Sequence, residues 1–151
     1  MFDPNQFLNT TITGANATKV IPVPEGEYVA QITHPPTFRE VTSDKFDGGS
    51  AVFCELVWSP QDLDGSIKAA TGRDGVTVRQ SIRLDLTPQG SLDMSDKANI
   101  GLGRLREALG QNDPSRPWGF SMLVGPAARI LVSHRTNGED VYAEVKRVTA
   151  L

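Results

Sequence analysis

The clearest pattern in the chain is a strict alternation of apolar and polar positions over residues 76–86. One set of alternate positions consists of Val76, Val78, Gln80, Ile82, Leu84 and Leu86. The intervening set is polar and contains two arginines, Arg79 and Arg83. Because successive side chains of a strand point to opposite faces, this pattern predicts a strand with one face in a core and a cationic outer face.

Two earlier stretches predict strands that pair with it. Residues 27–33 alternate in the same way, and residues 38–41 resume that strand beyond the proline pair at 35–36, which interrupts it. In residues 51–58 one alternate set is wholly apolar and belongs to the core, which leaves Phe53 on the outer face. The alternative is that this strand faces the other way and buries Phe53.

After the alternating strand the period of the pattern changes. Apolar residues at three- and four-residue spacing predict one helix within residues 92–110, with Ser95 as its N-cap and Gly110 just past its end. Two glycines weaken the first half of this segment, so the helix is expected chiefly over residues 102–109. Residues 118–124 predict a further short helical turn.

The chain closes with a predicted hairpin, residues 127–135 and 141–148, around the turn pair Asn137-Gly138. The resulting order of strand, strand, strand, helix, strand, strand is that of the OB-fold, a five-stranded Greek-key barrel. We therefore predict a mostly β protein with one main helix (β-β-β-α-β-β) over residues 22–151, preceded by an N-terminal arm, residues 1–21.

Composition and charge fit one globular, intracellular domain. The chain has 151 residues, of which 38% are hydrophobic and 22% charged. No segment approaches the roughly 18 apolar residues of a membrane span, the N-terminus lacks the pattern of a secretory signal, and Cys54 is the single cysteine. We expect no membrane partner. The net charge of −3 weighs against general adhesion to polyanions, whereas a local cationic face acts within roughly 8–10 Å, a Debye length.

Several segments resemble the phage-encoded single-stranded DNA-binding proteins, small OB-fold proteins of phage replication and recombination modules. The resemblance covers roughly residues 22–148 and rests on the order of elements and on PVPEGEYVAQI, VFCELVW, RQSIRLDL, GLGRLREALG, LVGPAARILVSHR and YAEVKRV. It implies a protein that coats single-stranded DNA in the cytoplasm of an infected host cell, with self-association and other phage replication or recombination proteins as further partners. The sequence ends VTAL without an acidic tail, so partner recruitment through such a tail is not expected.

Single strands are bound by cationic grooves together with aromatic side chains on which bases stack. The side chains on predicted outer faces or loops that fit this chemistry are Arg79, Arg83, Phe53, Arg39, Phe46, Lys45, Lys68, Arg73, Arg135, Tyr142 and Lys146. Two of them belong to the long polar connection 59–75, a length typical of a functional or disordered loop. Simpler interpretations exist: the arginines as an ordinary solvated face, Phe46 as a loop anchor beneath the barrel and Tyr142 as cover for its surface.

No other chemistry has comparable support in the sequence. His34 and His134 lack metal-ligand spacing, and neither a P-loop nor a complete dinucleotide fingerprint occurs, so we expect neither an enzyme nor a cofactor. Asp62 and Asp64 form an Asp-x-Asp pair that suits a divalent ion or, more commonly, a solvated acidic loop. Two alternatives to DNA binding stay open: a protein-interaction or structural accessory module of a phage, and a nuclease inhibitor suggested by the acidic net charge.

Overall fold

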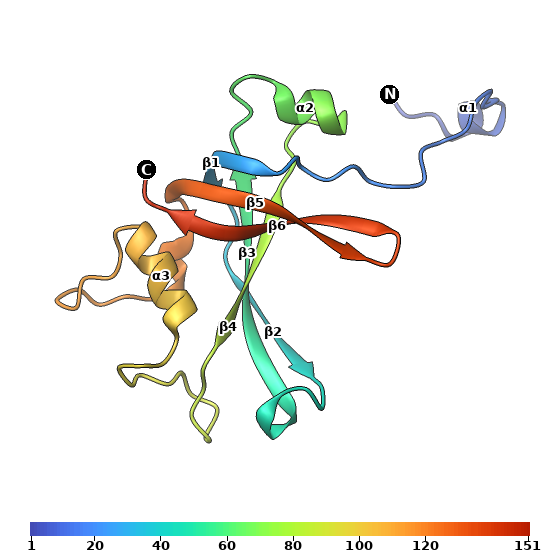
Figure 1. Cartoon of the computed structure of the whole chain (residues 1–151). Helices are drawn as coiled ribbons and strands as arrows, with labels where there is room; N and C mark the ends of the chain where they lie inside the picture. Colours follow the sequence, from blue (N-terminus) through green and yellow to red (C-terminus); the bar gives the residue numbers. More distant parts are fainter.

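A computed structural model describes the whole chain, residues 1–151, and is dominated by one six-stranded sheet (Figure 1). The strands are β1 (Gly26–Ile32), β2 (Thr37–Thr42), β3 (Ser50–Pro60), β4 (Val78–Leu84), β5 (Ala127–Asn137) and β6 (Asp140–Thr149). The helices are α1 (Pro4–Leu8), α2 (Ser66–Thr71) and α3 (Ile100–Ala108), with short 3₁₀ turns η1 (Asp47–Gly49) and η2 (Phe120–Leu123). The predicted mostly β character is confirmed.

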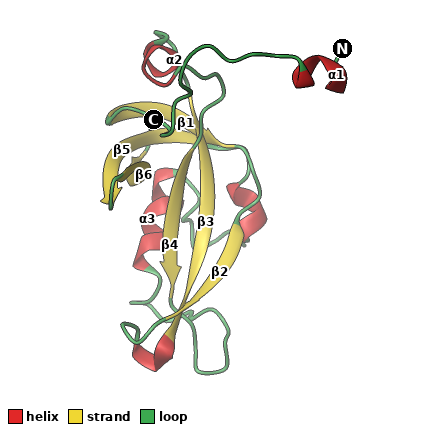
Figure 2. Ribbon diagram, turned by 90° about the vertical axis from the view of Figure 1, so that its right-hand side faces the viewer, coloured by secondary structure: helices red, strands yellow, loops and turns green.

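Five of the strands close into a ring. The hydrogen-bonded order is β1-β5-β6-β4-β3, and β1 also pairs with β3, which completes the circuit. All pairs are antiparallel except β4 with β6, which meet at a single parallel position, Arg79 opposite Glu144. Beyond the ring, β2, β3 and β4 continue as a long three-stranded sheet, and the β5–β6 hairpin crosses it (Figures 1 and 2).

The first predicted strand is divided in two, as its proline pair indicated. β1 pairs with one end of β3, where Ile32 lies opposite Trp58, and β2 pairs with the other half, where Thr37 lies opposite Glu55. Both lie along the same edge of β3, because β4 occupies the other edge. The prolines at 35–36 cannot donate a backbone hydrogen bond, so the ladder breaks there and β2 resumes it.

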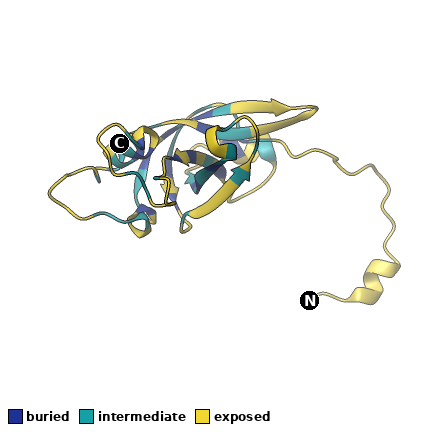
Figure 3. Cartoon of the chain, turned by 90° about the horizontal axis from the view of Figure 1, so that it is seen from below, coloured by how far each residue is buried: buried dark blue, intermediate teal, exposed yellow.

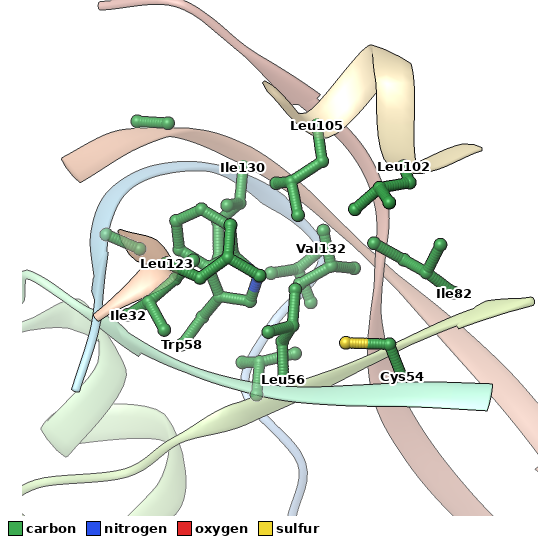
Figure 4. Close-up of a cluster of buried hydrophobic side chains, with 14 of the residues drawn as sticks. Ile32, Cys54, Leu56, Trp58, Ile82, Leu102, Leu105, Leu123, Ile130 and Val132 are labelled. Carbon is green, nitrogen blue, oxygen red and sulfur yellow. The ribbon is translucent and has the colours of Figure 1, made fainter. Parts of the chain in front are cut away.

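The core fills the ring and explains the alternation in the sequence. The inner faces of β3 and β4 bury Cys54, Leu56, Trp58, Val78, Ile82 and Leu84, and α3 adds Leu102 and Leu105 (Figure 4). Gln80 stands among apolar residues in the sequence because its Oε1 accepts a hydrogen bond of 2.8 Å from Trp58 Nε1. That bond satisfies the one polar group of the buried indole.

Helix α3 lies close to the segment 102–109 in which the helix was chiefly expected, but its N-cap differs from the prediction. Ser95 is not its N-cap; the helix starts after Asn99, which adopts a left-handed conformation with φ 57°. The Asn99 side chain accepts a 2.7 Å bond from the Asp85 backbone and donates to the Asp85 carbonyl, tying the start of α3 to the end of β4. The C-terminal prediction is confirmed: Gly110 has φ 69° and donates to the Glu107 carbonyl, as in a Schellman cap.

The connecting segments confirm some predictions and change others. The predicted turn in residues 118–124 is η2, whereas α2 in the long connection 59–75 was not predicted. Every residue from 1 to 21 is exposed, including those of α1, and the arm extends away from the sheet (Figure 3). None of the helices has the length and apolar character needed to cross a membrane.

Candidate nucleic-acid interface

The outer face of β2, β3 and β4 brings predicted cations and aromatics into one row. In the register of the sheet, Phe53 on β3 lies between Arg39 on β2 and Arg83 on β4. Neighbouring strands are about 4.8 Å apart, so the Phe53 side chain leaves the sheet between those of two arginines. The guanidinium carbon of Arg39 lies 5.8 Å from the centroid of the Phe53 ring. The outward orientation predicted for Phe53 is therefore confirmed.

Phe46 adds a second ring to this row from the turn that joins β2 to β3. The centroid of the Phe46 ring lies 6.2 Å from that of Phe53, and the Arg83 guanidinium carbon lies 5.1 Å from the Phe46 centroid. Gly48 and Gly49, both with positive φ, turn the chain back directly after it. Phe46 is half-buried against the outer face, rather than anchored beneath the ring. We call Arg39, Phe53, Phe46 and Arg83 the sheet ladder.

The arginines of this face differ in their partners. Arg39 donates from Nε to Glu55 Oε1 at 2.9 Å, and the other oxygen of Glu55 accepts from Ser81. Arg79 and Arg83 have no carboxylate within ion-pair distance. They lie four residues apart on β4, about 13 Å along the strand. These two arginines are therefore the charges of this face most available to an anion.

The β5–β6 hairpin forms a facing wall with a similar pair of groups. Arg135 and Tyr142 are cross-strand partners, with the guanidinium carbon 5.8 Å from the ring centroid, and Tyr142 is 45% exposed. Arg135 also pairs with Glu144 at 3.3 Å. This wall carries two further carboxylates at the hairpin end, Glu139 and Asp140, so it is more acidic than the sheet ladder.

A groove of about 1740 Å³ runs between the two walls. Among the predicted binding residues it is lined by Arg39, Arg73, Arg79, Arg135, Tyr142 and Lys146. Residues 18–23 lie along it as well, held by a 3.0 Å bond from Arg73 Nη2 to the Ile21 carbonyl and by a 2.7 Å contact between His134 Nε2 and the Val23 carbonyl. No local pattern indicated that the end of the arm would line this groove.

Three predicted residues, Phe46, Phe53 and Arg83, adjoin the groove on the same outer face without lining it. Two others are not brought to the groove. Lys45 is exposed on the turn after β2, and Lys68 on α2 forms an ion pair of 3.2 Å with Asp74. Local sequence placed these lysines in loops but carried no information on where the loops would fold.

The remaining candidates of the sequence have structural roles. The carboxylate of Asp62 accepts from the backbone of Ile67 and Lys68 at 2.9 and 2.8 Å, and that of Asp64 accepts from Ser66, so the acidic pair orders the start of α2. The hydrogen bonds from the side chain and backbone of Ser66 lower the pKa of Asp64. Burial raises the pKa of the Cys54 thiol to about 11, which keeps it protonated and unreactive near neutral pH.

The chain matches no protein-family model, and no curated protein matches it.

Proposed function

We propose that this protein binds single-stranded DNA without catalysing a reaction, through the groove and the adjoining sheet ladder. The observation that carries the proposal is the row formed by Arg39, Phe53, Phe46 and Arg83, in which two neighbouring half-buried rings lie between two guanidinium groups. Bases stack on aromatic faces while cations contact the phosphates. Such contacts do not read base edges, so little sequence preference follows.

The arrangement of the strands supports an OB-fold as the scaffold. The ring β1-β5-β6-β4-β3 is closed, and the main helix α3 lies between the third and fourth ring strands along the chain. In OB-folds the groove on the barrel surface is a common site for oligonucleotides. Together with the sequence resemblance, this supports membership of the phage single-stranded DNA-binding proteins, acting in replication or recombination within the infected cell.

A second candidate is a protein-interaction or accessory module, and the N-terminal arm favours it. Phe2, Phe7, Leu8 and Ile12 are all more than 60% exposed. Apolar side chains on an extended segment are common where a chain docks on another protein or on a second copy of itself. In that case the arm, rather than the groove, would carry the main function.

The two candidates differ in how they respond to DNA and salt. We would measure fluorescence anisotropy of a labelled oligo-dT of about 30 nucleotides, long enough for more than one OB-fold, against duplex competitor. Single-strand binding predicts saturable binding that duplex does not displace and that weakens with salt, because bound cations release counterions. Absence of binding at low salt would contradict the proposal and favour the interaction module.

A further inference from the structure

A second hollow lies over the seam where β4 and β6 separate. The two strands pair only at Arg79 and Glu144 and then diverge, and α3 packs across the opening. Helix α3 and strand β4 approach closely at Gly101, where an added Cβ would lie 3.3 Å from the Ile82 side chain. The resulting seam hollow has a volume of about 710 Å³.

A β-bulge directs cations of β6 toward this seam. Val132 lies opposite Val145 and Leu131 opposite Arg147, so Lys146 is the extra residue without a partner. A bulge breaks the alternation and re-aims side chains. Here it leaves Lys146 and Arg147 both exposed although they are adjacent in sequence, and both line the seam hollow.

The seam hollow is more cationic than the groove. The residues that line it include the cations Arg83, Arg104, Lys146 and Arg147 and a single carboxylate, Asp85; the guanidinium group of Arg83 lies over Phe46 on the outer face. That carboxylate already accepts a 2.7 Å hydrogen bond from the Asn99 backbone. Of the four cations only Arg147 has an ion pair, a 3.7 Å contact with Glu27 in which both side chains are more than half exposed. An exposed pair of this kind is weak.

The groove, by contrast, is almost balanced in charge. It is lined by the cations Lys19, Arg39, Arg73, Arg79, Arg135 and Lys146 and by the carboxylates Glu55, Asp74, Glu139, Asp140 and Glu144. The two hollows are adjacent, since Gln80, Ser81, Val145 and Lys146 line both. A polyanion that lies in the groove would therefore meet uncompensated positive charge where the groove ends, over the seam.

We propose that the seam hollow is a second phosphate-binding segment, which holds the backbone of a single strand as it leaves the groove toward α3. Lys146 marks the passage between the two hollows, and Arg104 and Arg147 contact phosphates beyond it. Ile100, Leu131 and Val148 give the seam hollow apolar surface on which a base can lie beside its phosphate. This inference rests on the proposed function and names the exit path of the strand.

The test compares Arg104→Ala/Arg147→Ala with the unaltered protein on oligo-dT of about 8 nucleotides, which lies within the site size of one OB-fold, and of about 24 nucleotides, which exceeds it. We expect unchanged affinity for the short oligonucleotide and about five- to tenfold weaker binding of the long one. The salt slope for the long oligonucleotide should become shallower by about 1.4, since each phosphate contact to a single strand contributes about 0.7.

A matched control is Arg116→Ala/Arg129→Ala, which removes two exposed arginines that line neither hollow. It should bind both oligonucleotides like the unaltered protein. An unchanged affinity of Arg104→Ala/Arg147→Ala for the long oligonucleotide, an equal loss on both lengths, or the same loss in the control would each overturn the seam segment while leaving groove binding intact. Absence of binding to either oligonucleotide by the unaltered protein would instead contradict the proposed function.

The alternative occupant of the seam hollow is an acidic protein. A poly-glutamate peptide of the same charge as the long oligonucleotide distinguishes it from a DNA strand. It should compete with the long oligonucleotide at least about tenfold more weakly than unlabelled oligo-dT, because it lacks bases that stack. Equal competition, relieved by Arg104→Ala/Arg147→Ala, would overturn the proposal and assign the seam hollow to an acidic protein.

Discussion

The two faces of β3 and β4 differ in almost every physical property although they share one backbone. The inner face, including Leu56 and Ile82, is buried and apolar. The outer face, including Phe53 and Arg83, carries charged, aromatic and small side chains and is half-buried or exposed. Because alternation assigns each side chain to one face only, fold stability and ligand binding depend on different residues of the same strands. The variants below should therefore change one property and leave the other.

The largest effect is expected on the inner face, for Leu56→Ala. Leu56 is fully buried at the centre of the ring (Figure 4), and truncating such a leucine removes about 2–5 kcal/mol of the free energy of unfolding. Urea denaturation followed by circular dichroism measures this loss. Oligonucleotide affinity of the folded fraction should stay the same, and a loss below about 1 kcal/mol would show that this position is less tightly packed than its burial indicates.

On the outer face, Arg79→Ala/Arg83→Ala should lose about 2–3 kcal/mol of binding free energy, since hydrogen bonds to charged groups contribute about 1.5–3 kcal/mol each and seldom add fully. The urea midpoint should be unchanged because both side chains are exposed and have no ion pair. Anisotropy titrations at several salt concentrations measure the effect.

The control for this pair is again Arg116→Ala/Arg129→Ala, which removes the same charge elsewhere. If the control weakens binding as much as Arg79→Ala/Arg83→Ala, then the overall charge of the protein, and not the β4 face, determines affinity.

Phe46→Ala should have the next largest effect. Stacking of one base on an aromatic side chain contributes about 1–3 kcal/mol, and Phe46 is half-buried, so we expect a loss near the lower end, about 1–2 kcal/mol. Phe7→Ala, which removes an exposed ring of the arm, should bind like the unaltered protein. The opposite result, with Phe7 important and Phe46 neutral, would move the binding site to the arm and favour the interaction module.

Much of this division between faces could be predicted from the sequence, because a strand has a period of two that any short window reveals. The alternation in residues 76–86 placed Arg79 and Arg83 on the outer face, and the apolar set in residues 51–58 placed Phe53 beside them. The hairpin around Asn137-Gly138 was predictable for the same local reason, since its turn chemistry lies within two residues.

The hollows were not predictable, because they depend on contacts between distant segments. Phe46 lies against Arg83 only because its turn folds onto β4, 37 positions further along the chain. Arg104 and Arg147 gather at the seam through a bulge at Lys146 and through the start of α3 at Asn99. Neither the bulge nor the left-handed Asn99 has a distinctive local pattern, so the strongest cluster of positive charge was not predicted.

The smallest predicted effect, and the only gain, is that of Glu55→Gln. Glu55 is the carboxylate next to the sheet ladder, and its Oε1 lies 2.9 Å from Arg39 Nε. Its side chain is 16% exposed and that of Arg39 is 60% exposed, so the pair is partly screened and worth at most about 1 kcal/mol. Replacing the carboxylate with an amide keeps the hydrogen bond to Ser81 possible, frees Arg39 for a phosphate and removes a repulsive charge. We expect binding about two- to threefold tighter, with a steeper salt slope, since one more cation is then neutralised by DNA.

Glu40→Gln is the matched control: Glu40 lies on the opposite face of β2 and does not line the groove. Equal tightening in both variants would attribute the gain to net charge, whereas a gain confined to Glu55→Gln would place the bound strand on the outer face at Arg39.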